Sequence, residues 1–398
     1  MSTKFESLKA RDSASICSTY GRYPLAVARA KGSRLWDLDG REYVDLLAGI
    51  AVTNLGHGHP EVVEAIKAQA DKLIHVSNLF HQEEQVALAE RLLDTCAAGR
   101  VFFCNSGAEA NEAACKLARR AMREVRGRDA HEIVTLKGSF HGRTLAMIAA
   151  TGQDKVKQGF APMPEGFTAV PWGDLDAVAS AITGRTAGVL VEIVQGEGGV
   201  RPLGQEFATG LQRLCRERGV LLMVDEVQTG LCRTGRFWAH QRFGLEPDIF
   251  TTAKALANGL PMGAMLATSE IACGFTPSSH ATTFGGGALV SAAASTVVDV
   301  MRRDRLDERA EELGHHARGL FREAAKTVGK VREVRGLGLM IGIELDMPGA
   351  GVWKALLDKG FVCNLTQDTV LRLLPALTIE RADLDAFAQA LAETLRSA

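Results

Sequence analysis

The chain has 398 residues, of which 46% are hydrophobic and 23% are charged, values typical of a globular protein with a large core and two domains. It contains 46 basic and 47 acidic residues, so the formal net charge is −1. This balance argues against nucleic acid or an anionic membrane as the main partner.

The N-terminal sequence, MSTKFESLKARDS, is polar and lacks the apolar core of a signal peptide. The longest weakly charged stretch, residues 271–298, is rich in Gly, Ser and Thr, and we do not expect it to span a membrane. The eight cysteines form no CxxC or zinc spacing. We therefore expect reduced thiols and a cytoplasmic location.

The middle of the chain alternates short apolar runs with helical patterns. The expected strands cover residues 100–104, 131–136, 187–194, 220–226 and 247–253, and the expected helices cover 110–125, 174–182 and 206–219. Strands that are apolar on both faces and alternate with helices predict a mostly parallel sheet in an α/β domain.

The C-terminal part has a different pattern. Residues 331–345, VREVRGLGLMIGIEL, predict antiparallel strands around a glycine turn. An apolar stripe marks a final helix through Leu384, Phe387, Leu391 and Leu395. These features predict a smaller α+β domain after about residue 290.

A strand, a small-residue turn and a helix follow one another in residues 102–120, FFCNSGAEANEAACKLARR. Ser106, Gly107 and Ala108 fall at the helix N-terminus, where free backbone N–H groups and the helix dipole suit a phosphate. Glycine lets the backbone approach such a group closely. The same turn could be only a helix cap, so this motif alone leaves both interpretations open.

Asp225 ends the buried strand of LLMVDEVQTG (residues 221–230), and a buried carboxylate needs a cationic partner. P-loop ATPases also carry an acidic residue at a strand end. However, the only Gly-Lys pair, Gly329-Lys330, lacks the GxxxxGK[ST] pattern that this class requires.

Two further ligand classes fit poorly. GLGLMIG, residues 336–342, has the wrong spacing for a dinucleotide site and no strand–helix context. His57 and His59 in LGHGHP resemble a metal pair, but no third or fourth ligand is evident nearby. We therefore predict no metal site.

Lys254 is the only charged residue in the segment IFTTAKALANGLPMGAMLATS, residues 249–269. Such a lysine can extend its head to the surface, or it can have a lowered pKa and attack a carbonyl carbon as a neutral amine. Pyridoxal phosphate needs a phosphate site, a buried carboxylate and a reactive lysine together. The lysine forms a Schiff base with its aldehyde, and the carboxylate keeps its pyridine nitrogen protonated.

The chain resembles the class III pyridoxal phosphate-dependent aminotransferases of the ω-amino group over nearly its whole length. The resemblance is carried, in this order, by LGHGHP, FFCNSGAEANEAACKLAR, GSFHGRT, VEIVQGEGGV, VDEVQTGLCRTG, AKALANGLPMGAM and TTFGGG. It implies the type I fold of these enzymes. A large, mostly parallel α/β domain would cover residues 56–290, and a smaller α+β domain would cover 291–398 with a contribution from the N-terminal segment 1–55.

The resemblance also implies contacts to pyridoxal phosphate. Lys254 would bind the cofactor covalently and move a proton, and Asp225 would pair with the pyridine nitrogen. The other contacts would be Ser106, Gly107 and Ala108 at the phosphate, Gln228 at the ring hydroxyl, and Phe140 stacked on the ring, although Phe140 could also be a core aromatic. Thr283 would contact the phosphate of the neighbouring subunit's cofactor, which implies a homodimer with active sites at the subunit interface.

The same resemblance implies substrate contacts. Arg143 would bind a substrate carboxylate through its planar guanidinium. Arg372 would bind the second carboxylate of 2-oxoglutarate, and Glu197 would cover Arg372 when an amino donor occupies the site. Thr282 would lie near the substrate, and Tyr20 is a further candidate. Ile50 stands where ornithine δ-aminotransferases tend to carry a tyrosine that engages the free α-amino group, so an apolar residue there tolerates an N-acyl group better.

Within the family, the similarity is strongest to members that transfer the δ-amino group of N2-acetyl-L-ornithine to 2-oxoglutarate in arginine biosynthesis. Succinylornithine, N-succinyl-diaminopimelate, ornithine and 4-aminobutyrate are alternative donors, because the enzymes that use them share the cofactor residues. An aminomutase of the same fold is an alternative from another reaction class. One departure from the family is Gly287-Ala288 in place of the usual Asn-Pro, which loosens the turn and for which we expect small effects.

Overall fold

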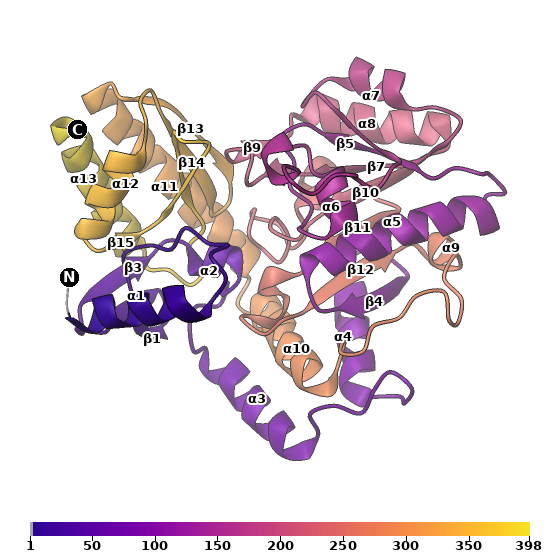
Figure 1. Ribbon diagram of the computed structural model, residues 1–398, viewed down its shortest axis with the longest axis horizontal. Coiled ribbons are helices and arrows are strands. Elements are labelled where there is room, and N and C mark those ends of the chain that lie inside the picture. Colours follow the sequence, from indigo (N-terminus) through magenta and orange to yellow (C-terminus); the bar gives the residue numbers. More distant parts are fainter. Residues whose placement is uncertain (1–2) are drawn as a thin grey trace.

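A seven-stranded sheet forms the centre of one lobe of the computed structural model, which describes residues 3–398 (Figure 1). The strand order is β4 (Arg100–Cys104), β12 (Gly263–Ala267), β11 (Ile249–Thr252), β10 (Leu221–Asp225), β7 (Thr186–Glu192), β5 (Glu132–Leu136) and β6 (Phe167–Val170). β12 runs antiparallel to both neighbours, and the other neighbouring pairs are parallel. The prediction of a mostly parallel α/β sheet is confirmed.

Helices cover both faces of this sheet, and its central strands β7, β10, β11 and β12 are buried along their whole length. α5 (Gly107–Glu124) packs on the face that carries Leu221 and Met223 of β10. α8 (Gln205–Arg218) packs on the opposite face with Leu222 and Val224. Successive side chains of a strand point to opposite faces, so both faces of β10 must be apolar. The shorter helices of this lobe are α6 (Leu145–Ala150), α7 (Leu175–Ala181) and α9 (Ser269–Ala272).

The second lobe contains an antiparallel sheet in the order β13 (Val331–Leu337), β14 (Met340–Leu345), β17 (Val370–Leu373) and β16 (Asn364–Thr366). The predicted antiparallel pair over residues 331–345 is β13 and β14. α11 (Leu306–Val328), α12 (Ala350–Asp358) and α13 (Arg381–Ser397) lie in this lobe (Figure 1). The predicted apolar stripe of α13 is buried at all four positions.

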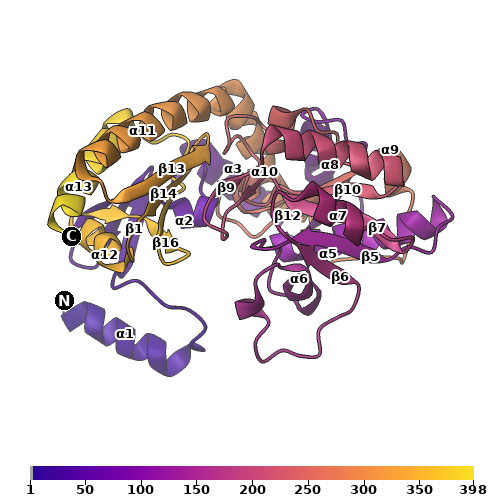
Figure 2. The ribbon, with the colours of Figure 1, turned by 90° about the horizontal axis from the view of Figure 1, so that it is seen from above.

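N-terminal strands join the C-terminal lobe. β1 (Val27–Lys31), β2 (Arg34–Asp37) and β3 (Glu42–Asp45) form antiparallel pairs, and β15 (Phe361–Val362) adds to β3 in parallel. Figure 2 shows α1 (Thr3–Ser15) standing away from the body of the molecule. None of the described residues of α1 is buried, but Phe5 is partly buried and shares a surface hollow with Pro24 and Leu25.

α10 (Ala288–Arg303) packs against α3 (Pro60–Lys72) and α4 (Glu83–Leu93). The domain boundary predicted at residue 290 lies inside α10, and the division of the chain into domains stays a prediction. The remaining short elements are α2 (Ala48–Ala51), β8 (Val194–Gln195), β9 (Arg201–Pro202) and three 3₁₀ helices, Asp154–Val156, Ala239–Phe243 and Lys254–Ala257. Among the helices of residues 3–398, none combines the length and the apolar character needed to cross a bilayer.

Arg233 ties the two lobes together from a fully buried position. Its Nη1 donates to the carbonyl oxygens of Pro375 at 2.6 Å and Leu339 at 3.1 Å, both in the C-terminal lobe. Its Nη2 donates to Asn54 Oδ1, and Asn54 Nδ2 donates to the carbonyl of Leu231 at 3.1 Å. Burial lowers the pKa of Arg233 to about 9, which leaves the guanidinium charged at neutral pH and stabilised by these oxygens.

We predict that Arg233→Leu lowers the free energy of unfolding by about 2–4 kcal/mol, because three buried oxygen atoms lose their donor. Urea unfolding followed by circular dichroism measures this change. Arg236→Leu is the matched control, because Arg236 is exposed and its replacement should change the stability by less than about 0.5 kcal/mol. Equal losses in the two variants would show that the Arg233 contacts do not stabilise the junction.

Candidate active site

A cavity of about 410 Å³ lies at the carboxyl ends of the parallel strands, the usual place for a ligand in an open α/β sheet. Nine residues predicted from the sequence line it: Ser106, Gly107, Ala108, Phe140, Arg143, Glu197, Asp225, Gln228 and Lys254. They belong to segments that follow five different strands, so the sheet topology brings together residues that are distant in the sequence.

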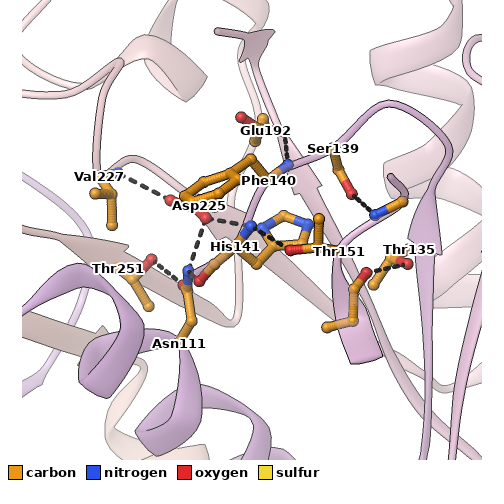
Figure 3. A network of polar contacts seen from close by, with 12 residues as sticks. Asn111, Thr135, Ser139, Phe140, His141, Thr151, Glu192, Asp225, Val227 and Thr251 are labelled. Carbon is orange, nitrogen blue, oxygen red and sulfur yellow. Dashed lines mark hydrogen bonds and ion pairs between the residues drawn. The ribbon is translucent and has the colours of Figure 1, made fainter. Parts of the chain in front are cut away.

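Asp225 is the last residue of β10 and is 5% exposed. Its Oδ2 accepts a hydrogen bond from Asn111 Nδ2 at 2.7 Å and lies 2.8 Å from His141 Nδ1. Its Oδ1 accepts the backbone N–H of Val227 at 3.0 Å. Figure 3 shows this arrangement around the carboxylate. Both carboxylate oxygens are thus held in place before any ligand binds.

Asn111 is itself oriented by two further groups. Thr251 Oγ donates to Asn111 Oδ1 at 2.7 Å, and Asn111 Nδ2 also donates to the carbonyl of His141 at 2.8 Å (Figure 3). Because the side-chain oxygen receives the Thr251 proton, the amide NH₂ must face Asp225. Neither Asn111 nor His141 was predicted, although both lie within the sequence motifs discussed above.

Glu192 faces Asp225 from the neighbouring strand, as its register partner. Burial raises the pKa of Glu192 well above its ordinary range, and the Asp225 charge adds to this effect. Its Oε2 accepts the backbone N–H of Phe140 at 3.0 Å. Glu192 therefore fixes the backbone that presents the Phe140 ring to the cavity, a contact that sequence reasoning missed.

The N-terminus of α5 borders the cavity through Gly107 and Ala108. Ser106 caps this helix, and its hydroxyl accepts the N–H of Glu109 at 3.2 Å. The first N–H groups of a helix have no partner within the helix, and together with the dipole they form an anion site. A Cβ at position 107 would lie 2.6 Å from Val227 Cγ1, so the close packing here requires glycine.

Lys254 lies two residues after the end of β11 and has a φ of +47°, in the left-handed region that non-glycine residues rarely adopt. Its side chain is half-buried and lines the cavity. Desolvation lowers the pKa of Lys254 and outweighs the opposing effect of the nearby acids, of which Glu197 contributes most. The neutral, nucleophilic amine is therefore more accessible here than in a lysine exposed to water.

Arg372 of β17 contacts Glu197, which lines the cavity. The Arg372 side chain is 2% exposed and that of Glu197 is 35% exposed, and Arg372 Nη1 donates to Glu197 Oε1 at 2.6 Å. Desolvation opposes ionisation of Glu197, but the guanidinium outweighs it and lowers the pKa of Glu197. Arg143 is exposed at the cavity, with its Cζ 5.1 Å from the centre of the Phe140 ring.

Five predicted site residues do not line this cavity, and one of them, Arg372, contacts the lining residue Glu197 from outside the lining. Thr282 and Thr283 line a neighbouring hollow, which is connected through Asn105, whose Nδ2 donates to Thr282 Oγ at 3.2 Å. Tyr20 is 74% exposed and Ile50 is 38% exposed. In the single chain described here, these two side chains lie outside the cavity wall.

The other sequence features are also located. Gly287 caps the N-terminus of α10, and a Cβ there would meet its nearest neighbour, the Phe284 carbonyl, at 3.4 Å. The asparagine common in the family would therefore fit. His57 Nε2 lies 2.7 Å from Asp45 Oδ2, and within residues 3–398 no cluster of three or more His, Cys, Asp or Glu side chains could hold a metal ion.

The cavity groups fit the pyridoxal phosphate expected from the sequence. The N–H groups at the start of α5 suit the phosphate, the Asp225 carboxylate suits the pyridine nitrogen, and Lys254 Nζ suits the aldehyde. Gln228 Oε1 is buried and has no hydrogen-bond partner among residues 3–398, which suits the ring hydroxyl. A buried acceptor without a partner is costly, so a donor at this position would relieve a cost in the ligand-free protein.

Comparisons with known proteins identify the family. Residues 16–395 match the family model described as aminotransferase class III. Acetylornithine aminotransferase from Methanocaldococcus jannaschii is 46% identical over 374 residues, 94% of each chain. Acetylornithine aminotransferase 1 from Bordetella bronchiseptica is 47% identical over 375 residues, 94% of this chain and 95% of the relative.

A solved structure of the ornithine aminotransferase from Toxoplasma gondii, which has partial occupancy of pyridoxal phosphate at its active site, superposes with a TM-score of 0.95. It is 31% identical, and the match covers 98% of this chain and 94% of that chain. The family and the fold predicted from the sequence are confirmed. With a family match that spans all but the ends of the sequence, the chain belongs to the class III aminotransferases.

Proposed function

We propose that the protein uses pyridoxal phosphate to transfer the δ-amino group of N2-acetyl-L-ornithine to 2-oxoglutarate, giving N-acetyl-glutamate 5-semialdehyde and glutamate in arginine biosynthesis. The names of the Methanocaldococcus and Bordetella relatives support this donor. The observation that carries the proposal is the ion pair of Arg372 with Glu197, which lines the same cavity as Lys254, because exchange of Glu197 for a substrate carboxylate would let one site accept substrates with different numbers of carboxylates.

Bound pyridoxal phosphate supplies the electron sink that makes the proton on the amino-bearing carbon acidic. Lys254 Nζ, in its neutral form, would take this proton and later give it back. Asp225, held by Asn111 and His141, would be the partner of the pyridine nitrogen. Phe140, held by its N–H bond to Glu192, would contact the ring.

The two substrates differ in charge. The donor has one carboxylate and a blocked α-amine, whereas 2-oxoglutarate has two carboxylates. Arg143 binds a carboxylate in both half-reactions. Arg372 binds the second carboxylate of 2-oxoglutarate only, and Glu197 pairs with Arg372 when the donor is present, because an unpaired buried guanidinium would be costly. Ile50 and Tyr20 remain candidates for contacts to the N-acyl end.

Two alternatives differ in what they consume. Succinylornithine, N-succinyl-diaminopimelate, ornithine and 4-aminobutyrate transaminases would use the same cofactor groups with another donor. An aminomutase would keep Lys254 and Asp225 but would not consume 2-oxoglutarate. The ornithine aminotransferase from T. gondii is 31% identical to this chain, whereas the two acetylornithine aminotransferases are 46% and 47% identical. The higher identity favours the N-acetylated donor.

The active unit is a homodimer under this proposal. Ile74, Leu79, Phe80 and Phe284 are 60%, 87%, 65% and 65% exposed. Their two loops are joined, since Asn78 Nδ2 donates to the carbonyls of Thr282 and Gly285. A second copy covering these side chains would remove them from water and would bring the exposed Thr283 towards a neighbouring phosphate.

Cytoplasmic location is a further proposal, supported by five buried free thiols.

The first prediction from the proposed function concerns the donor. With 2-oxoglutarate as acceptor, kcat/KM for N2-acetyl-L-ornithine should exceed that for ornithine and 4-aminobutyrate by about tenfold or more, because the free α-amine of ornithine loses solvation near apolar groups. Coupled detection of glutamate measures each rate. A higher kcat/KM for any other donor would assign the substrate to that donor, and product formation without 2-oxoglutarate would support the aminomutase.

The second prediction concerns pH. In apoenzyme, the rate at which Lys254 captures pyridoxal phosphate should reach half its maximum below pH 10.5, the ordinary lysine pKa, because desolvation favours the neutral amine. Absorbance follows the capture, and borohydride reduction with peptide mapping should place the label on Lys254. Glu197→Gln should shift the half-point to still lower pH, because a nearby negative charge that stabilises the ammonium is removed. A profile like that of a free lysine would contradict the lowered pKa.

The third prediction concerns assembly. Leu79→Asp should convert the dimer to monomer and weaken retention of the cofactor, because a charge cannot be buried at the interface without a partner. Light scattering and absorbance after dialysis measure the two effects. Phe160→Asp is the control, because Phe160 is 58% exposed and lies outside the proposed interface. A wild-type monomer would overturn the proposed dimer.

A further inference from the structure

Asn364 holds the guanidinium of Arg372 on the side opposite Glu197. The two residues are register partners on the neighbouring strands β16 and β17. Asn364 Oδ1 accepts hydrogen bonds from Arg372 Nε at 3.0 Å and from Nη2 at 2.6 Å. Arg372 Nη1 is left to face Glu197. One edge of the guanidinium is therefore occupied by a neutral amide, and only the other meets a charged partner.

The orientation of Asn364 is set by groups behind it. Asn364 Nδ2 donates to the Tyr23 hydroxyl at 3.1 Å, and this hydroxyl donates to the carbonyl of Cys363 at 3.1 Å. Burial raises the pKa of Tyr23, so its proton stays available for that bond. The Tyr23 ring packs edge-on against Trp353, with 4.7 Å between ring centres. Because the NH₂ group is used on Tyr23, the oxygen of Asn364 must point at Arg372.

A neutral acceptor and an acidic one would have different effects at this position. An amide oxygen aligns the guanidinium without neutralising it, so the positive charge remains available for a carboxylate that arrives from the cavity. A second permanent carboxylate would pair with Arg372 in both half-reactions and would compete with the substrate. Glu197 is partly exposed while Arg372 is buried, so Glu197 is the member of the pair that can move aside.

The proposed function requires Arg372 to alternate between Glu197 and a substrate carboxylate without moving. Glu197 is also restricted at its backbone, since its carbonyl accepts hydrogen bonds from Thr366 Oγ at 2.9 Å and Gln367 Nε2 at 2.7 Å. The exchange thus needs only a side-chain rotation of Glu197, provided that the guanidinium is held from behind.

We propose that Asn364 is a positioning residue for selection of a dicarboxylate acceptor: it holds Arg372 aligned and fully charged, so that a second carboxylate can replace Glu197. This inference rests on the proposed role of Arg372 in binding 2-oxoglutarate. It adds a residue from β16, and through it Tyr23 of the N-terminal segment, to the determinants of acceptor specificity.

Asn364→Asp tests the proposal in the holoenzyme. Glutarate, a dicarboxylate that cannot react, and pentanoate, its monocarboxylate counterpart, are titrated calorimetrically. We expect the dissociation constant of glutarate to rise about tenfold or more, because the new carboxylate pairs with Arg372. The dissociation constant of pentanoate should change less than about twofold. In stopped-flow half-reactions, the KM for 2-oxoglutarate should rise, and the rate with the amino donor should stay within about twofold of wild type.

Two further variants guard against a simple folding defect. Asn364→Leu removes the acceptor without adding a charge and should also weaken glutarate binding, by about threefold to tenfold. Tyr23→Phe leaves Asn364 in place but removes the hydroxyl that orients it, and should produce a smaller loss in the same direction. Leu365→Met, on the same strand, is the volume-conserving control and should bind both acids as the wild type does.

Arg372→Ala, measured in the same series, tests the proposed role of Arg372 separately from that of Asn364. Loss of glutarate binding in Arg372→Ala, with normal binding in both Asn364 variants, would overturn the role of Asn364 and leave the proposed function intact. Normal glutarate binding in Arg372→Ala would overturn the proposed role of Arg372 and the inference with it. Equal weakening of glutarate and pentanoate in Asn364→Asp would also overturn the inference, because it would indicate a general defect of the site.

Discussion

The buried Asp225 carboxylate is the constraint around which the site is organised. A carboxylate at 5% exposure is tolerated only when its oxygens are satisfied, and here Asn111, His141 and the Val227 amide satisfy them. Two of these partners have further contacts. Asn111 connects α5 to β11 through Thr251, and the backbone of His141, next to Phe140, bonds to Asn111 and Thr151. The stability of the ligand-free centre and the geometry of the cofactor site therefore depend on the same hydrogen bonds.

The two neighbouring acids of this sheet edge have different hydrogen-bond partners. Asp225 and Glu192 are register partners on adjacent strands, and both are nearly enclosed. The polar network is concentrated on Asp225, whereas Glu192 accepts only the Phe140 N–H in the network of Figure 3. Burial is the main cause of the raised pKa of Glu192, and the nearby Asp225 charge adds to it. Asp225 lines the cavity where the cofactor is expected, whereas Glu192 holds the backbone beside it.

Much of the large lobe could be predicted from the sequence because its strands are apolar on both faces. Asp225 at the end of β10 and Gly107 at the start of α5 followed from local patterns. β12 had no counterpart among the predicted strands, because its run GAMLA is short, rich in small residues and shows no alternation. Contacts such as Asn111 to Asp225 could not be predicted, since they depend on how α5 crosses the sheet rather than on any spacing in the chain.

The residues around Arg372, where the second carboxylate of 2-oxoglutarate would bind, also include a contact that the sequence could not predict. The resemblance to the family pointed to Arg372 and Glu197, residues whose charges make them conspicuous. Asn364 is neutral and lies on a short strand, so no pattern singled it out; only the register of β16 against β17 reveals it. A neutral residue can nevertheless govern a charged one. Asn364 occupies two N–H groups of Arg372 without cancelling its charge. The charged guanidinium can therefore exchange the Glu197 carboxylate for a substrate carboxylate. This exchange requires the guanidinium to keep one orientation throughout.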